Sequence, residues 1–369
     1  MKNNFRFNRK IKTVIIIALC WMFFISFSYV NQYFFVADLL TLNKLSGKYG
    51  FWQDFYGNLI LGAFGGIAGG YLLVFKMERR YKQRSFLFGI INSGLMFILF
   101  YLTVAVFGLF FMGLVYHWLQ IGFVTAVERA WRNLLINIQT PSFFVTMCVW
   151  GFLVSITQFM LQVNDKFGPG ILWKFITGKY YNPREEERIF MFLDLKSSTT
   201  IAEKVGNKKY FEFIREVFHD ITEPIINSCG EIYQYVGDEV VISWKVENGL
   251  SNNNCLICFF NIEQTIEERK EHYLKKYGLL PSFKAGLHIG EATVGEIGVI
   301  KRDIVFSGDV LNTTSRIQGE CNNHNVNILL SSTLLHRMPM NGEYEKIPLG
   351  EIQLKGKQEK VALNTITLK

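Results

Sequence analysis

Four stretches in the first half of the chain are apolar for long enough to cross a lipid bilayer. They cover Thr13–Val36, Gly57–Phe75, Phe86–Tyr116 and Phe143–Val163. A hydrocarbon core of about 30 Å needs roughly 20 apolar residues in a helix, because lipid offers no partner for backbone N–H and C=O groups. The third stretch is longer than an upright helix needs, but no polar turn divides it, and we interpret it as one tilted or extended span. The first half therefore predicts a membrane region of four helices.

Basic residues cluster on one side of these spans. Those before the first span and after the second are Lys2, Arg6, Arg9, Lys10, Lys12, Lys76, Arg79, Arg80, Lys82 and Arg84. The segments Asp38–Tyr56 and His117–Pro141 carry only two Lys or Arg residues each. Under the positive-inside rule the N-terminus and the Lys76–Arg84 loop are cytoplasmic, and four crossings return the chain to the cytoplasm. Because this clustering accounts for much of the net charge of +8, the charge does not indicate a nucleic-acid partner.

Glycines line one face of the second span. Gly62, Gly66 and Gly70 recur at four-residue intervals, with Gly65 and Gly69 beside them. A neighbouring helix can approach such a face closely, either within the same chain or in a second copy. The spans lack the buried acidic and basic residues that mark an ion path, which argues against a channel or transporter, although four helices can still bind a lipid or another apolar ligand.

The chain becomes charged and mixed after residue 165, as in a soluble domain. We divide it into a four-helix membrane domain at 1–165, a linker at 166–187 and a soluble domain at 188–369. In the linker, Gly168-Pro169-Gly170 breaks any continuous helix. Ile171–Ile176, which is apolar and aromatic around one lysine, is typical of a segment that lies at a lipid surface.

The six cysteines are scattered and indicate no oxidising compartment. Cys255-Leu-Ile-Cys258 has the spacing of a metal or redox motif, but no second such pair and no nearby His accompany it. It opens an apolar helical pattern through Phe259, Phe260 and Ile262, so we interpret both thiols as core residues.

Two segments of the soluble half each place an aspartate at the end of an apolar run. Asp194 ends a run of strand length that begins at Ile189, and Asp238 follows Gly237 in what resembles a tight hairpin. After the first run, Thr200-Ile-Ala-Glu203 has capping-box spacing and predicts a helix start. Side by side, the two carboxylates would suit two magnesium ions roughly 3.5–4 Å apart, as in phosphoryl transfer. The alternative is that Asp194 only caps a helix and Asp238 only makes a turn.

Strand and helix patterns alternate through the soluble half. Strands are expected at 188–194, 231–236, 239–245, 283–289, 292–296, 303–306, 326–330, 344–355 and 359–367, and helices at about 200–228, 252–277 and 310–320. Runs of strands with helices between them predict an α+β, ferredoxin-like sandwich.

Five motifs follow one another through this half. They are Phe192-Leu-Asp-Leu-Lys-Ser-Ser-Thr199, Val236-Gly-Asp-Glu239, Ala285-Gly-Leu-His-Ile-Gly290, Ser307-Gly-Asp-Val-Leu-Asn-Thr-Thr-Ser-Arg316 and Leu354-Lys-Gly356. In this order they resemble the catalytic domain of class III nucleotidyl cyclases, the adenylate and guanylate cyclases. The resemblance covers about residues 186–369, and it favours a metal-binding role for the two aspartates.

The resemblance implies a metal and phosphate site. Asp194 and Asp238, with the main-chain carbonyl of Leu195, would hold two Mg²⁺ or Mn²⁺ ions per site. Backbone amides at the following helix start would hold phosphate oxygens. These amides belong to Lys196, Ser197, Ser198 and Thr199. Lys355 is implied as a contact to the terminal phosphates, and His288, which has no assigned chemistry, is interpreted as a core or interface residue.

The resemblance also implies that two subunits share each site. Arg316, with its charged fork, would stabilise negative charge on the α-phosphate, and Asn312, one turn earlier, would orient the ribose. In this family the metal aspartates come from one catalytic domain and the Asn and Arg from another. One such domain per chain therefore implies a homodimer with two equivalent sites.

Base choice in the family depends on two positions that are occupied here by Gln234 and Val305. Adenylate cyclases usually carry Lys at the first and Asp or Thr at the second, whereas guanylate cyclases typically carry Glu and Cys. The amide of Gln234 offers both a donor and an acceptor, and Val305 offers only packing. ATP is the expected substrate on family grounds, while GTP and the pyrimidine nucleotides stay open.

The expected function is that of an adenylate cyclase-type phosphorus–oxygen lyase integral to the plasma or inner membrane, with a cytoplasmic catalytic domain. It would form a 3′,5′-cyclic nucleotide and pyrophosphate for intracellular signalling. Its expected partners are a nucleoside triphosphate, a second copy of the chain and membrane lipid. The alternative from another class is a catalytically silent, nucleotide-binding signalling module.

Overall fold

The computed structural model describes residues 4–42, 51–77, 85–121, 123–168, 170–339, 344–354 and 360–368. Contacts within the chain divide it into two compact units, one that ends at Trp173 and one that runs from Lys174 to Lys369.

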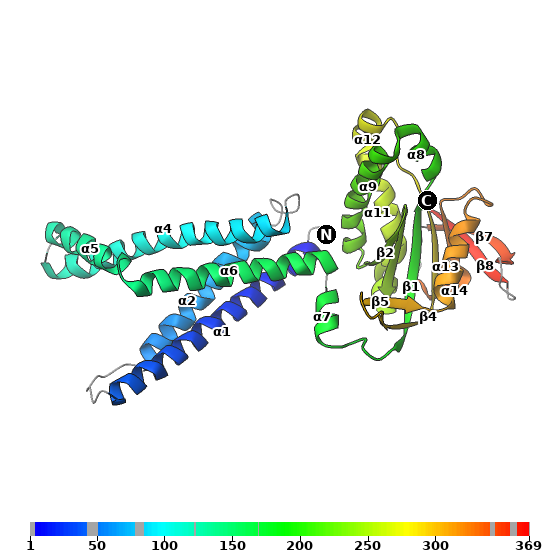
Figure 1. Ribbon diagram of the computed structural model, residues 1–369. Helices are drawn as coiled ribbons and strands as arrows, with labels where there is room; N and C mark the ends of the chain where they lie inside the picture. The colour runs from blue at the N-terminus through cyan, green and yellow to red at the C-terminus, as the bar shows by residue number, and fades with distance from the viewer. Residues whose placement is uncertain are drawn as a thin grey trace. The chain divides into compact units, whose positions relative to one another are not determined.

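The first unit consists of long helices (Figure 1). They are α1 (Asn4–Leu42), α2 (Phe51–Tyr71) with its π-helical continuation η1 (Leu72–Met77), α4 (Phe86–Ile121), α5 (Phe123–Ile138) and α6 (Pro141–Phe167). The segments long and apolar enough to cross a membrane are Lys10–Asp38, Asn58–Met77, Phe86–Thr103 and Phe143–Lys166. They overlap the four expected stretches, although the third is shorter than expected, and α4 is continuous over that stretch, which agrees with its interpretation as one span.

The glycine face of α2 packs against α1 of the same chain. A side chain added at Gly62 would meet Met22 Cα at 2.8 Å, and one added at Gly66 would meet Ala18 Cα at 2.5 Å. Only glycine permits this approach of the two backbones. Packing within the chain, one of the two expected possibilities, therefore accounts for the four-residue spacing.

Helix α5 is an element that the sequence analysis missed. The segment His117–Pro141 was expected only as a connection, but its helix buries Ala126, Ala130 and Leu134 at four-residue intervals. Charged residues at 128, 129 and 132 lower the hydropathy of this segment. A search for helical periodicity, rather than for long apolar runs, would have revealed it.

A short helix lies at the sequence boundary between the units. Helix α6 ends at Phe167 with Gly168 (φ 91°) as its C-cap, so the break predicted at these glycines is confirmed. Helix α7 (Ile171–Ile176) follows and has no buried residue.

Eight strands form one sheet in the second unit. They are β1 (Arg184–Leu195), β2 (Glu231–Val236), β3 (Glu239–Lys245), β4 (Phe283–Ile297), β5 (Asp303–Ser307), β6 (Ile328–Ser331), β7 (Tyr344–Ile352) and β8 (Val361–Leu368). Their order is β2-β3-β1-β4-β6-β8-β7, and β5 pairs with β4. The helices are α8 (Ser198–Val205), α9 (Asn207–Asn227), α10 (Val246–Leu250), η2 (Ser251–Asn253), α11 (Asn254–Glu268), α12 (Lys270–Tyr277), α13 (Asp309–Glu320) and α14 (Ser332–Arg337). The expected α+β class is confirmed.

The two faces of β1 pack against different helix layers, as Figure 1 shows. Ile189, Met191 and Leu193 belong to the large core with α9 and α11, which also buries Cys255 and Cys258 as interpreted. Phe190 and Phe192 belong to a second cluster with Val310 of α13. Because side chains alternate along a strand, Asp194 lies in phase with this second cluster and faces the α13 layer.

Several element boundaries differ from the predictions. The strands expected at 283–289 and 292–296 form one continuous strand, β4, because Gly290 between them does not make a turn. Helix α8 begins at Ser198, so Thr200 lies in its first turn and the predicted cap at Thr200 is wrong. The helix expected at 200–228 is divided at Gly206, where φ is 81°, and that at 252–277 is divided at Arg269.

Candidate active site

Asp194 and Asp238 lie at the ends of neighbouring strands. The antiparallel register of β1 and β3 places Asp194 opposite Glu239, the first residue of β3. Asp238 immediately precedes Glu239 in the β2–β3 hairpin, where Gly237 adopts the left-handed conformation (φ 63°) that closes the turn. The fold thus brings together two acidic residues that are well separated in the sequence.

The carboxylates at this end of the sheet interact electrostatically. Burial raises the pKa of Asp194, and the negative charge of Asp238 raises it further. Burial and the charges of Asp194 and Asp238 raise the pKa of Glu239 to about 7. This repulsion is the unfavourable energy that a divalent cation between the aspartates would remove.

The donor atoms here suit a hard divalent cation. Two carboxylates, from Asp194 and Asp238, and the main-chain carbonyl of Leu195 are oxygen ligands of the kind that Mg²⁺ and Mn²⁺ prefer. Within the described ranges no three His, Cys, Asp or Glu side chains form a metal-binding group.

Two side chains that the sequence analysis missed contact Asp194. Lys284 Nζ lies 3.1 Å from Asp194 Oδ2, and Gln318 Nε2 donates to the same oxygen at 3.1 Å. Lys284 stands opposite Asp194 in the β1–β4 register, and Gln318 belongs to α13. A lone lysine between the buried residues Phe283 and Ala285 is the sequence signal that could have indicated the first of these contacts.

The turn after β1 ends in a helix start that is not capped by its own side chain. Ser197 is the N-cap of α8, with φ 56° and no side-chain cap hydrogen bond. The N–H groups of Ser198 and Thr199, in the first turn, have no partner within the helix and lie at its positive end, where an anion is favoured. The backbone N–H of Lys196 instead donates to Ser282 O at 2.9 Å, so this amide is not free as the predicted phosphate contact requires.

The side chains of Lys196 and Tyr210 complete the surroundings of this turn. Lys196 Nζ donates to Asn327 Oδ1 at 2.5 Å. The Tyr210 hydroxyl is hydrogen-bonded to Ser198, and burial together with the charges of Asp238 and Asp194 raises its pKa. The sequence analysis did not identify Tyr210, because nothing in the pattern of α9 distinguishes it from a core aromatic residue.

Asn312 and Arg316 lie on the outer side of α13. The helix buries Val310, Thr313, Thr314, Ile317 and Gln318, whereas Asn312 is exposed and Arg316 is half-buried. Neither Asn312 nor Arg316 has a side-chain hydrogen bond or ion pair with another described residue. Arg316 precedes Gln318, which contacts Asp194, by two residues, or roughly 200° around the helix. Within one chain Arg316 therefore points away from the aspartates.

The two positions predicted to recognise the base lie on strands that a hydrogen bond connects. Gln234 is exposed on β2, and its amide bonds no other residue in the described part of the chain. Val305 is half-buried on β5 and pairs with Gly295. The Tyr233 hydroxyl accepts the N–H of Phe306 at 3.1 Å, which links β2 to β5 next to both positions.

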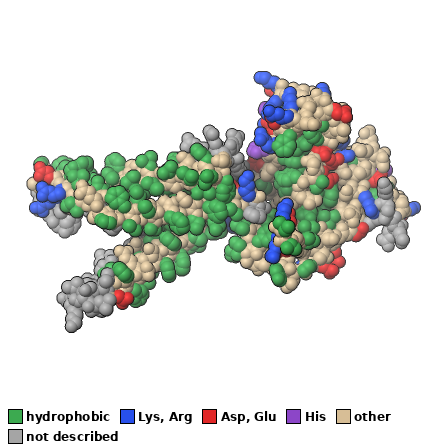
Figure 2. All heavy atoms as spheres, in the orientation of Figure 1, with side chains coloured by type: hydrophobic (Ala, Val, Ile, Leu, Met, Phe, Trp, Pro, Cys, Tyr) green, Lys and Arg blue, Asp and Glu red, His purple; other side chains and the backbone are tan. Residues whose placement is uncertain are grey.

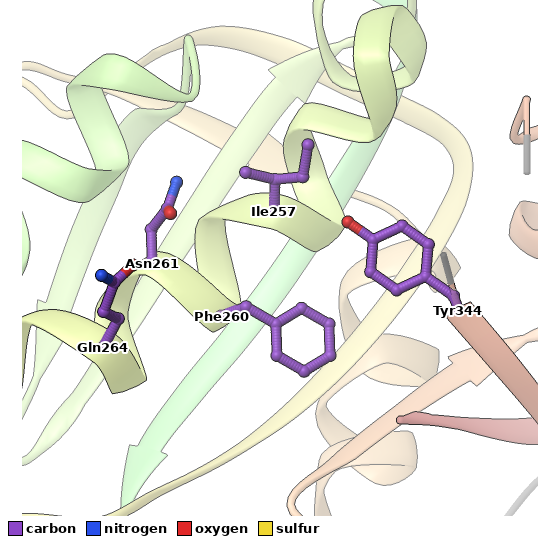
Figure 3. Close-up of a pocket in the computed structure, with 5 residues that line it drawn as sticks. All are labelled: Ile257, Phe260, Asn261, Gln264 and Tyr344. Carbon is purple, nitrogen blue, oxygen red and sulfur yellow. The ribbon is translucent and has the colours of Figure 1, made fainter. Parts of the chain in front are cut away.

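The remaining predicted residues lie elsewhere. Lys355 falls outside the described residues. His288, interpreted as a core or interface residue, is half-buried, and its Nδ1 lies 2.7 Å from Ser331 Oγ. A surface hollow of about 430 Å³ lies on α11 and is lined by Ile257, Phe260, Asn261, Gln264 and Tyr344 (Figure 3). It holds no charged residue, and α11 packs on the sheet face opposite Asp194, so this hollow is not part of the site.

Known proteins resemble the second unit. Residues 180–367, about half of the chain, match the family model of the adenylate and guanylate cyclase catalytic domain. Adenylate cyclase 2 of Rhizobium meliloti is 35% identical over 209 residues, which cover 57% of this chain and 58% of that protein. The adenylate cyclase of Anabaena cylindrica is 23% identical over 176 residues, covering 47% and 35% of the two chains. This chain thus spans less than two thirds of the length of either relative.

A solved structure of a bacterial light-regulated adenylyl cyclase has the same fold. The superposition covers 63% of this chain and 65% of that one, with a TM-score of 0.51 and 20% identity. Together with the family match and the paired aspartates, this places the second unit in a known class. The chain belongs to the adenylate and guanylate cyclase catalytic domain family.

Proposed function

We propose that the chain is a membrane-bound nucleotidyl cyclase that converts a nucleoside triphosphate, ATP in preference to others, to the 3′,5′-cyclic monophosphate and pyrophosphate. The observation that carries the proposal is the juxtaposition of Asp194 and Asp238 beside an uncapped helix start. The catalytic fold would be the ferredoxin-like core β1-α9-β2-β3-α11-β4, reached from the membrane part (1–165) through the linker (166–187).

Each side chain has a defined task in this proposal. Asp194, Asp238 and the carbonyl of Leu195 would hold the cations, which when bound favour ionisation of the ribose 3′-hydroxyl and neutralise the triphosphate. The amides of Ser198 and Thr199 would hold phosphate oxygens. From a second subunit, Asn312 would orient the ribose and Arg316 would stabilise charge on the α-phosphate as the ribose oxygen attacks it and pyrophosphate leaves.

The placement of α13 supports the homodimer. Gln318 faces Asp194 of its own chain, so Arg316 on the outer side of the same helix cannot face that carboxylate as well. An arginine with no partner among the described residues can serve the aspartates of another copy. Two copies related by a two-fold axis would then build two equivalent sites.

The surface of the first unit supports the membrane location. Phe23, Phe64 and Phe107 are 72%, 72% and 70% exposed, and apolar side chains cover much of this unit in Figure 2. Such a surface is stable against lipid and not against water. The basic residues favour a plasma or inner membrane protein whose N-terminus and catalytic unit are cytoplasmic. Residues 78–84 of the basic loop lie outside the described residues.

The proposed preference for ATP rests on the relative that is 35% identical and named an adenylate cyclase. Gln234, whose amide is free to pair with either donor or acceptor groups, is compatible with adenine but does not require it. GTP and pyrimidine nucleotides are therefore part of the test.

The test is an assay of the full chain in lipid nanodiscs with ATP, GTP, CTP or UTP and Mg²⁺ or Mn²⁺. We expect cyclic AMP as the main product and no product after metal chelation. A different cyclic nucleotide would change the substrate and keep the mechanism. If no nucleotide gives a cyclic product although dimerisation is verified, the chain is instead the catalytically silent, nucleotide-binding signalling module.

A further inference from the structure

We propose that the tip of the β4–β5 hairpin docks on the anionic lipid surface of the membrane that holds the helices. We define the hairpin tip as residues 297–302. It begins at Ile297, the last paired residue of β4, and ends just before Asp303, with which Ile297 pairs. The proposal rests on the membrane location proposed above, but it is independent of cyclase activity.

The hairpin tip presents aliphatic side chains that are largely or fully exposed. Val299 is 93% exposed, Ile300 is 104% exposed and Ile297 is 59% exposed. Single exposed aliphatic residues are ordinary on protein surfaces, but three within four positions of a turn are not. Turns are normally built from small and polar residues, which can remain in water without loss.

The hairpin tip lies at the end of the sheet where the chain enters the second unit. Glu296 N–H donates to Tyr180 O at 3.0 Å, and Gly295 lies against Pro183, just before β1. Figure 1 shows β5 at the same end of the sheet as the segment that leads into β1. Two other apolar residues of this entering segment, Ile176 and Tyr181, are 66% and 70% exposed.

The short connection to the membrane part makes lipid accessible to this end. Residues 168–173 separate the last residue of α6 from Lys174, the first residue of the second unit. Even fully extended, six residues reach only roughly 20 Å. A bilayer that holds α6 is therefore within a short tether of the place where the chain enters the second unit.

The charges of the hairpin tip identify the kind of surface. Lys301 and Arg302 are exposed and follow the two aliphatic residues directly. The acid that follows them in the sequence, Asp303, accepts the backbone N–H of Ile304 at 3.0 Å and so belongs to the start of β5. Apolar side chains beside cations are the pattern that binds an anionic headgroup region. A convex tip of a few residues is too small for a stable protein interface, which needs about 800 Å² per partner.

The test places a photoreactive benzophenone amino acid at position 300 of the full chain in nanodiscs. A matched chain carries it in place of Phe211, which is 70% exposed but lies beside Tyr210, near the other end of β1 and roughly 35 Å away along the strand. After irradiation we expect lipid adducts at position 300, and several-fold fewer at position 211. In discs with anionic lipid, changing Lys301 and Arg302 to alanine should lower the yield by roughly fivefold per residue.

Each other outcome would overturn the proposal. A cross-linked dimer at position 300 would show that a second copy covers the hairpin tip. No adduct above the position 211 background would show that it stays in water. Neither result bears on the cyclase, because the cross-linking needs no nucleotide, and a chain that also carries Asp238→Asn should give the same lipid yield.

Discussion

Asp238 offers the most direct test of the site at the scale of a single residue. Asn has the same size as Asp but no charge, so Asp238→Asn would remove a cation ligand while the β2–β3 turn is kept. Loss of a residue that only supports a metal ligand costs 10–100-fold, so we expect a loss of roughly 100-fold or more in kcat. Cyclic nucleotide formation is the measurement, with a circular dichroism spectrum as the folding control.

The charge repulsion at the site gives this prediction a second readout. Asp238 raises the pKa of both Asp194 and Glu239, so removing its charge lowers the electrostatic repulsion among these carboxylates in the metal-free protein. The thermal stability of the metal-free chain should therefore be unchanged or higher, while its stabilisation by Mn²⁺ should shrink. A variant that retains full activity would show that Asp238 only shapes the turn.

Gln234 and Val305 allow a prediction about base selection. Guanine presents N–H donors at N1 and at its 2-amino group, where adenine presents the N1 acceptor and a C–H, and a carboxylate can accept from these donors. We expect Gln234→Glu combined with Val305→Cys to shift the ratio of kcat/KM for GTP and ATP towards GTP by roughly 10–100-fold. Competition assays with both nucleotides measure this ratio. An unchanged ratio would mean that backbone groups or other side chains read the base.

The residues that the sequence analysis identified and those that it missed differ in a physical way. Asp194 and Asp238 interrupt apolar strands, and a local interruption is visible in any sequence. Lys284 and Gln318 matter because strand register and helix packing bring them to Asp194. Such contacts depend on tertiary structure, which no local pattern encodes. The amide of Lys196 was misassigned for the same reason, because its partner Ser282 lies in a distant segment.

At the scale of elements, Gly286 explains why α13 can lie where it does. A Cβ at this position would come within 2.7 Å of Gln318 Cα and 2.7 Å of Thr314 O, so the backbone of α13 rests directly on β4. Gly286→Ala should displace α13 and with it Asn312 and Arg316. We expect a loss of about 1–3 kcal/mol in stability, as for other overpacked sites, and a fall in kcat.

Gly319, on helix α13 itself, provides the control for this prediction. Nothing lies within 4 Å of a Cβ at Gly319. Gly319→Ala should therefore be neutral or stabilise α13 by up to about 1 kcal/mol, because alanine favours helix. Thermal unfolding and turnover of both variants would be compared. Equal effects at the two positions would contradict the close approach at Gly286.

Helices α9 and α12 are joined by a charged contact that predicts a pH dependence. Burial alone would raise the pKa of Glu216, but hydrogen bonds with Lys276, Tyr277 and His272 outweigh burial and lower it to about 2. A carboxylate with a lowered folded-state pKa stabilises the protein above its unfolded value, near 4.5, and this stability is lost as the pH falls towards 2.

The Glu216→Gln variant tests this dependence. At pH 7 we expect it to unfold at a lower temperature than the parent chain, and the difference should shrink between about pH 4.5 and 2 as the parent carboxylate takes up its proton. Glu212→Gln, an exposed position on the same helix, should have little effect at any pH. A difference between Glu216→Gln and the parent that stays constant with pH would show that packing, not charge, holds the two helices together.

The elements predicted correctly are those with strong apolar patterns. The four long helices and strands β1 and β3 are rich in apolar residues, and α13 has a clear buried face. Helix α5 was missed because the charged residues on its exposed side lower its hydropathy, and β4 was divided at Gly290, a residue type common in turns. In β4 this glycine instead makes room for α13, so its meaning depends on what packs above the strand.

At the scale of the whole molecule, the two faces of α13 imply that one chain cannot complete its own site. Each site would then combine Asp194 and Asp238 of one subunit with Arg316 of the other. Asp194→Ala and Arg316→Ala chains should each be inactive alone. Co-expressed in equal amounts, half of the dimers are mixed and each rebuilds one intact site, so activity should return to about a quarter of the parent level.

A second mixture is the control for this complementation. Asp194→Ala and Asp238→Ala remove acids from the same half of the site, so a mixed dimer holds no intact site and should stay inactive. Differently tagged chains, purified in sequence through both tags, would verify that mixed dimers form. If Arg316 acts across the subunit boundary, every mixed dimer of Asp194→Ala and Arg316→Ala chains contains one intact pair of aspartates facing one intact arginine. If these chains co-assemble and activity still does not return, Arg316 does not act across the boundary.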